Sequence, residues 1–267
     1  MSDGTVAPAA LLARAARRGV GALALTDHDD TSGLAEASAA AREWGIQFIN
    51  GVEISVTWQT ETIHIVGLGI DPENVELQRG LEATRAGRTD RARRMAAEFD
   101  TIGITGTFEG AIRLAGNPRM ISRTHFARYL CEEGKVKSTR DAFRRWLGAG
   151  RPCCVDQKWA AMADAVSWIS GSGGVAVIAH PGRYSLDHLR LRELFAEFRD
   201  AGGAALEVIT GSHQAQEYAM FANFAKEFGL AGSCGSDFHS PQESRDLGGL
   251  PRLPGGCEPV WQRMRGV

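Results

Sequence analysis

Residues 19–30 have the sequence GVGALALTDHDD, in which a short apolar run ends in acidic residues around a histidine. Such a run is typical of a buried strand in an α/β fold, where reactive side chains follow the strand's carboxyl end. Further apolar runs of this kind occupy residues 47–54, 62–70, 174–179, 204–209 and 230–234. Helical patterns cover residues 8–18, 34–44, 189–200 and 214–228. The alternation predicts an α/β fold with a parallel sheet or barrel.

A different pattern occupies residues 74–155, which are rich in Arg, Ala and Glu and lack strand signals. Residues 85–99, RAGRTDRARRMAAEF, have the periodicity of an amphipathic helix. We therefore expect a barrel built from residues 1–73 and 156–267, with residues 74–155 as a helical insertion.

Composition excludes several classes of protein. The 267 residues are 43% hydrophobic and 23% charged, as in folded chains, and no apolar run reaches the length of a membrane helix. The net charge of −2 argues against a strongly basic nucleic-acid coat. The five cysteines are odd in number and form no C-x-x-C pair, and no secretory signal is expected, so a reducing cytoplasm is favoured.

Histidines and carboxylates follow nearly every predicted strand. They are His28 with its acidic neighbours, Glu53, His64, His180, Asp237 and His239. Any one of them has a simpler interpretation, such as a hydrogen-bonded core histidine for His64. Asp237 and His239 are the stronger pair, because residues two apart in extended chain point the same way. Together, imidazoles and carboxylates suit Mn, Fe, Zn or Mg in a polynuclear site that generates hydroxide and clamps a phosphate.

The order of these motifs resembles the PHP (polymerase and histidinol phosphatase) family. The matching motifs are S-D-G (2–4), T-D-H-D (26–29), G-x-E-I-S (51–55), I-H-I-V-G (63–67), A-H-P-G (179–182) and G-S-D-F-H (235–239). The resemblance implies a distorted (β/α)7 barrel with up to three divalent metals. SRTHFARYL (122–130) and AFRRWLGAGRP (142–152) are similar to a bacterial subgroup with 3′,5′-nucleotide bisphosphatase and 5′→3′ exoribonuclease activity. The likeness extends over essentially the whole chain.

The resemblance also implies roles for individual residues. Glu53 would bridge two metals, with His64 and His180 completing one of these sites and Asp237 belonging to the other. Asp3, His28 and His239 would hold the third metal. Arg123 and His125 would contact the substrate phosphate, for which the planar guanidinium of an arginine is suited. His180, His239 and Asp237 would be the catalytic residues.

One part of the family pattern is missing. The family opens with a strand that ends in D-x-H-x-H, and its two histidines would bind the metal shared by Glu53 and Asp237. The first barrel strand is therefore expected to be absent, because the sequence starts at Met1-Ser2-Asp3-Gly4. Either the start codon is placed too late or the chain is truncated and impaired. We favour the first, because every later motif is intact.

The expected function is metal-dependent hydrolysis of nucleoside 3′,5′-bisphosphates, short 5′-phosphorylated RNA or both, in the cytoplasm. Manganese is the expected cofactor, with Fe, Zn or Mg as alternatives, and a small nucleotide or short RNA is the expected partner. No membrane and no obligate protein partner are expected. Two alternatives stay open: a histidinol-phosphatase-like enzyme, or a degenerate nucleotide- or metal-binding protein without turnover. The roles of Glu207, His213 and Lys158 are also open.

Overall fold

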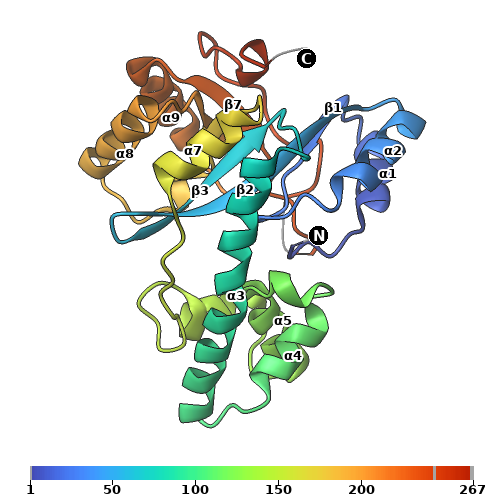
Figure 1. The fold of residues 1–267 in the computed structure, drawn as a ribbon, viewed down its shortest axis with the longest axis vertical. Helices are drawn as coiled ribbons and strands as arrows, with labels where there is room; N and C mark the ends of the chain where they lie inside the picture. The colour runs from blue at the N-terminus through green and yellow to red at the C-terminus, as the bar shows by residue number, and fades with distance from the viewer. Residues whose placement is uncertain (1, 243–244, 265–267) are drawn as a thin grey trace. The chain divides into compact units, whose positions relative to one another are not determined.

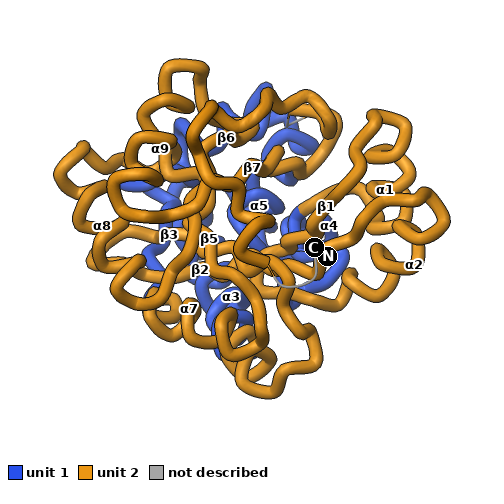
Figure 2. Tube along the Cα trace, turned by 90° about the horizontal axis from the view of Figure 1, so that it is seen from above, with its two compact units in different colours: residues 1–3, 82–158 blue, residues 4–81, 159–267 orange. Residues whose placement is uncertain are grey.

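The computed structural model describes residues 2–242 and 245–264, which form a mixed α/β fold (Figure 1). The chain divides into two compact units (Figure 2). Unit 1 comprises Met1–Asp3 and Glu82–Lys158, and unit 2 comprises Gly4–Leu81 and Trp159–Val267. The predicted α/β fold class is confirmed. No helix in the described part of the chain has the length and apolar character that crossing a bilayer requires.

Unit 2 contains a seven-stranded sheet with the order β1-β2-β3-β5-β6-β7, and β4 pairs with β2. The strands are β1 (Ala22–Leu25), β2 (Gln47–Trp58), β3 (Glu61–Leu68), β4 (Ala160–Ala161), β5 (Val175–Ile178), β6 (Ala205–Thr210) and β7 (Ala231–Gly235). The pairs β1–β2, β5–β6 and β6–β7 are parallel, as the sequence predicts. The pair β2–β4 is parallel as well, although the sequence does not predict a strand at β4. The carboxyl ends of these strands therefore lie at one edge of the sheet, and the T-D-H-D, A-H-P-G and G-S-D-F-H motifs lie at the carboxyl ends of β1, β5 and β7.

Strand β3 differs from this expectation, because it runs antiparallel to both β2 and β5. Only Gln59 and Thr60 separate β2 from β3, and Gln59 takes a positive φ of 51°. A two-residue connection can return a strand only as an antiparallel neighbour, whereas a parallel neighbour needs a crossover of about a dozen residues or more. The short turn thus sets the direction of β3.

Five helices flank this sheet in the described residues of unit 2 (Figure 1). They are α1 (Pro8–Arg17), α2 (Leu34–Trp44), α7 (Met162–Gly171), α8 (His188–Asp200) and α9 (Ala215–Phe228). Pro8 starts α1, where a missing N–H costs nothing. Gly45 and Gly229 end α2 and α9 with φ of 66°, which glycine adopts without strain. The 3₁₀ helices η3 (Pro181–Arg183) and η4 (Val260–Gln262) are shorter.

The sheet is covered on both faces by apolar side chains. Neighbouring residues of β3 point to opposite faces, so Ile65 packs in one cluster with Ile54 and Ile178, while Val66 packs in a second with Val177. This explains why the strands appear in the sequence as nearly continuous apolar runs rather than as alternating patterns.

The regular elements in the described residues of unit 1 are all helices. Helix α3 (Val75–Thr101) contributes residues 82–101 to it. The other elements are α4 (Thr107–Leu114), η1 (Pro118–Met120), α5 (Arg123–Glu132), α6 (Thr139–Ala142) and the π-helical turn η2 (Phe143–Leu147). Its own core centres on Phe99 and Phe126, whose rings stack at 6.0 Å. Gly110 lets α4 approach α5 closely, since a Cβ there would lie 2.1 Å from the Tyr129 ring.

Candidate metal centre

Glu53 lies at the centre of a cluster of histidines in unit 2. It projects from β2, and one of its oxygens, Oε1, is 2.9 Å from His64 Nδ1 on β3. The same oxygen is 3.0 Å from His180 Nε2, which follows β5. The two imidazole nitrogens are 3.3 Å apart. Three ligand-type atoms from three neighbouring strands therefore converge on one point.

The other oxygen of Glu53 faces a different histidine. His28 Nδ1 lies 3.6 Å from Glu53 Oε2, and the His28 ring meets the His64 ring edge-on at 4.7 Å between centroids. A parallel bridge between His28 and Glu53 extends the β1–β2 pairing and fixes this approach. One oxygen of Glu53 thus faces two imidazoles and the other oxygen faces a third, which is the arrangement that a bridging carboxylate needs.

Asp237 and His239 lie after β7. Asp237 has a φ of 51°, and it can share a cation-sized space with Glu53 and His180, because one ligand atom of each lies within 4.8 Å of the others. Arg183 donates to Asp237 Oδ2 at 2.6 Å. The Nδ1 of His239 lies 2.9 Å from the carbonyl of Asp237, so Nδ1 carries the proton and the lone pair belongs to Nε2. The His28 and His239 rings are 6.4 Å apart.

The donor set fits a divalent cation. Ligand atoms about 2.1 Å from one cation lie about 3.0–3.4 Å from each other in octahedral or tetrahedral geometry. The three distances among Glu53, His64 and His180 fall close to that range. In addition, the Nδ1 atom of His180 is buried and has no hydrogen-bond partner among the described residues. Mixed carboxylate and imidazole donors suit Mn, Fe, Zn or Mg.

The electrostatics favour the metal-binding protonation states of Glu53 and His64. For His180, burial acts to lower the pKa, but the hydrogen bond with Glu53 raises it above its usual value. Burial lowers the pKa of His64 to about 4, although the charge of Glu53 opposes the shift. Burial by itself raises the pKa of Glu53, but nearby His28 and His64 and hydrogen bonds from the imidazoles lower it well below its usual range. At neutral pH the cluster therefore holds an ionised carboxylate beside a neutral imidazole, and both can donate lone pairs.

Comparison with known proteins decides the family. Residues 1–152 match the sequence profile of the PHP domain. The chain belongs to the PHP domain family. It is 51% identical over 264 residues to a 3′,5′-nucleoside bisphosphate phosphatase of Chromobacterium violaceum, covering 98% of this chain and 93% of the relative. It is 40% identical over 263 residues to a 5′-3′ exoribonuclease of Escherichia coli, covering 98% and 89%. The predicted membership of the PHP family is confirmed.

Two solved structures have the same fold. An amidohydrolase structure from Chromobacterium violaceum, with bound sulfate and no metal, superposes with a TM-score of 0.95 at 51% identity, over 98% of this chain and 92% of the other. A putative metal-dependent phosphoesterase from Bifidobacterium adolescentis gives 0.83 at 27% identity, over 93% and 87%. The relatives are hydrolases by name, in agreement with the predicted enzyme class.

The other predicted residues of this PHP chain lie in unit 1. Asp3 is buried there, and its Oδ2 accepts hydrogen bonds from the hydroxyls of Ser122 at 3.3 Å and Thr124 at 3.0 Å. Arg128 donates to the main-chain carbonyl of Asp3 at 2.7 Å. The SRTH segment thus binds Asp3, a contact that sequence reasoning missed. The assignment of Asp3 to one metal with His28 and His239 stays a prediction.

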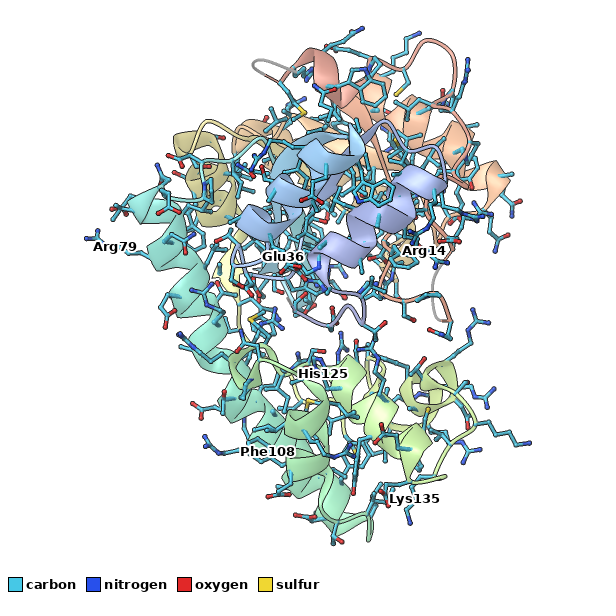
Figure 3. All side chains as sticks on the ribbon, turned by 90° about the vertical axis from the view of Figure 1, so that its right-hand side faces the viewer. Arg14, Glu36, Arg79, Phe108, His125 and Lys135 are labelled. Carbon is cyan, nitrogen blue, oxygen red and sulfur yellow. The ribbon has the colours of Figure 1, made fainter. Side chains whose placement is uncertain are left out.

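Arg123 and His125 differ in accessibility. His125 is only 1% exposed and caps α5, because its Nδ1 accepts the main-chain N–H of Ser122 at 3.0 Å (Figure 3). Arg123 is half-buried, donates to the carbonyl of Leu147 at 3.3 Å, and lies over the Phe143 ring. Lys158 is exposed. Phosphate binding by Arg123 and His125 stays a prediction.

Four further residues support the centre and were not assigned such roles from the sequence. Asp29 is fully buried and accepts the main-chain N–H of Ser55 at 2.9 Å, which anchors β2 two residues beyond Glu53. The other three, Tyr184, Glu207 and His213, contact the main chain around His180 and His64. Burial raises the pKa of Glu207 to about 8. For Tyr184, the available sequence signal was its position, because Arg183 and Tyr184 directly follow the A-H-P-G motif.

Proposed function

We propose that this PHP chain is a metal-dependent phosphoesterase that hydrolyses nucleoside 3′,5′-bisphosphates and short 5′-phosphorylated RNA. The observation that carries the proposal is the position of Glu53, with His64 and His180 on one oxygen and His28 on the other. The relatives named as a bisphosphate phosphatase and an exoribonuclease, each matched over 98% of this chain, support the substrate class.

The proposal gives each residue of the centre a task. Bound divalent cations would supply a nucleophile at neutral pH and neutralise charge on the phosphate oxygens. Glu53 would hold two of them, His64 and His180 would complete one site, and Asp237 would serve the other. The tautomer of His239 directs the Nε2 lone pair away from Asp237. Manganese is our choice of cation, since the carboxylate and imidazole donors accept it.

Arg183 contributes charge at the same place. Its guanidinium pairs with Asp237 and is half-exposed, so it can reach a phosphate from solvent. The five cysteines, all among the described residues, carry free thiols, which supports our inference that the enzyme works in the reducing cytoplasm.

The test is phosphate release from adenosine 3′,5′-bisphosphate by the purified protein with Mn²⁺. We expect turnover that EDTA abolishes. Loss of a residue that supports a metal ligand typically lowers activity by about 10- to 100-fold. Glu53→Gln changes a proposed ligand itself, so it should lower kcat by more than this. Glu61→Gln, the same change on β3 outside the centre, is the matched control and should leave kcat unchanged.

Two further substrates decide between the alternatives. Short 5′-phosphorylated RNA should also be cleaved, whereas histidinol phosphate should be a much poorer substrate. Faster turnover of histidinol phosphate would favour the other PHP phosphatase activity. No turnover of any of the three, with Mn²⁺ bound, would favour a binding protein and reject the proposal.

A further inference from the structure

The turn that carries His180 has a strained main chain. His180 adopts φ 29° and ψ 57°, in the left-handed region that a residue with a Cβ seldom occupies. Such a conformation costs about 1–3 kcal/mol and persists only where surrounding contacts determine it. The contacts that do so are therefore part of what places His180 Nε2 against Glu53.

Glu207 holds the first residue of this turn. Its Oε2 accepts the main-chain N–H of His180 at 2.7 Å, and the side chain is buried. The register of the β6–β7 pair shifts between Glu207 and Ile209, and such an irregularity re-aims a side chain. The carboxylate is closely seated, because a Cβ on Gly235 would lie 2.2 Å from its Oε1.

His213 holds the third residue of the turn. Its Nε2 accepts the main-chain N–H of Gly182 at 2.9 Å, while Nδ1 lies 3.0 Å from the carbonyl of Val208. One neutral tautomer, protonated at Nδ1, satisfies both contacts. The ring is buried and stacks on Phe221 at 4.6 Å. A Cβ on Gly182 would lie 2.8 Å from this ring, so only glycine lets the two approach.

Tyr184 connects the turn to the neighbouring ligand strand. Its hydroxyl donates to the carbonyl of Ala179 at 2.8 Å and accepts the main-chain N–H of His64 at 3.0 Å. The backbone positions of His180 and His64 are therefore linked, and a shift of the turn is transmitted to both imidazoles.

We propose that Glu207 and His213 are positioning residues that clamp the 180–182 turn, so that His180 meets Glu53 at coordination distance. The inference rests on the proposed function, in which His180 binds a metal. Neither residue is assigned as a ligand, because Glu207 Oε2 and both ring nitrogens of His213 contact main-chain groups of the turn and of Val208. Removing Glu207 leaves the N–H of buried His180 without its acceptor, and removing His213 releases the N–H of Gly182. Either change frees the strained turn.

The experiment measures Mn²⁺ affinity by isothermal titration of the purified protein, with the metal alone as the probe. Glu207→Leu and His213→Phe should weaken binding by about 10- to 100-fold. His213→Phe keeps an aromatic ring to stack on Phe221 but loses both hydrogen bonds. Glu207→Gln keeps an acceptor oxygen for the His180 N–H, so it should restore affinity to within about threefold of wild type.

Thermal unfolding in EDTA distinguishes an effect on the position of His180 from a general loss of protein stability. Ser172→Ala, which removes a buried hydroxyl that donates to the carbonyl of Ile169 at 2.7 Å, is the control and should lower the melting temperature without changing Mn²⁺ affinity. Variants that behave like this control would overturn the inference and leave the proposed function intact. A wild-type protein that binds no Mn²⁺ would instead reject the proposed function and, with it, this inference.

Discussion

Backbone strain in unit 2 is concentrated in residues at the candidate metal centre. Apart from Gln59 in the β2–β3 turn, the non-glycine residues with positive φ among those described are Asp29, His180 and Asp237, with φ of 48°, 29° and 51°. Asp29 follows the bridge residue His28, and His180 and Asp237, which are candidate ligands themselves, follow β5 and β7. Aspartate and histidine tolerate this region better than most residues, yet each still costs free energy. The folded protein is therefore less stable than it would be with unstrained backbone at these three positions, and the strained conformations orient side chains at the candidate centre.

Asp29 offers a test of this interpretation. Its carboxylate accepts both the N–H and, at 3.3 Å, the hydroxyl of Ser55. Asp29→Ala should lower the free energy of unfolding by about 1–3 kcal/mol, because the buried N–H of Ser55 loses its acceptor. Urea denaturation measures the change. Asp29→Asn is the matched control: it keeps an acceptor oxygen and tolerates left-handed φ, so it should cost clearly less. Equal losses in both variants would contradict the assignment.

At this scale, the sequence indicates the candidate ligands better than the residues that hold them. Glu53 and His64 lie within recognisable strands and His180 follows one, so their convergence needs only the pairing of neighbouring strands. Glu207 and His213 act instead on main-chain N–H groups 27 and 31 residues away in the sequence. Such contacts depend on the backbone path of one strained turn. This path cannot be predicted from the pattern of residue types in the sequence. The same holds for His125, whose burial as a helix cap follows from its packing in unit 1.

Among the elements, most strand positions were predictable, whereas the direction of β3 was not. The apolar runs place the described strands β1, β2, β3, β5, β6 and β7 within a few residues. The reversal of β3 depends on Gln59 adopting a left-handed conformation, and the sequence there lacks the Asn-Gly or Gly pair that signals a tight hairpin. Helix α7 was also missed, because residues 162–171 follow the insertion without a capping residue.

Helix α3 packs against α7 through a glycine within unit 2, which yields a prediction for these elements. A Cβ on Gly80 would lie 2.4 Å from ring atoms of Trp168, so Gly80→Ala should lower the free energy of unfolding by about 1–3 kcal/mol through overpacking. Gly171, the last residue of α7, has nothing within 4 Å of its Cβ position. There the same substitution should stabilise by up to about 1 kcal/mol. Denaturant melts of the two variants should therefore shift in opposite directions; a shift in the same direction would refute the close helix contact.

For the whole molecule, the candidate metal centre is formed by residues from distant parts of the sequence. His28, Glu53, His64, His180 and Asp237 all belong to unit 2, and each follows or lies within a different element. An unfolded chain cannot hold these side chains together, so a cation binds the folded state far more tightly than the unfolded one. If the proposed centre binds its cation, metal binding and folding of unit 2 are therefore linked.

This linkage predicts a measurable gain in stability. Free Mn²⁺ at 100 times its dissociation constant should stabilise the folded protein by about 2.7 kcal/mol, which corresponds to a rise in Tm of about 5–10 °C for a chain of this size. Differential scanning calorimetry with Mn²⁺ and with EDTA measures the rise. Glu53→Gln should abolish it, because the remaining imidazoles lack the carboxylate that they share. Phe126→Ala, which empties part of the separate core of unit 1, should cost about 3–5 kcal/mol yet keep the response to Mn²⁺. If Glu53→Gln kept the full rise in Tm, the cation would bind elsewhere in the protein and the assigned centre would be wrong.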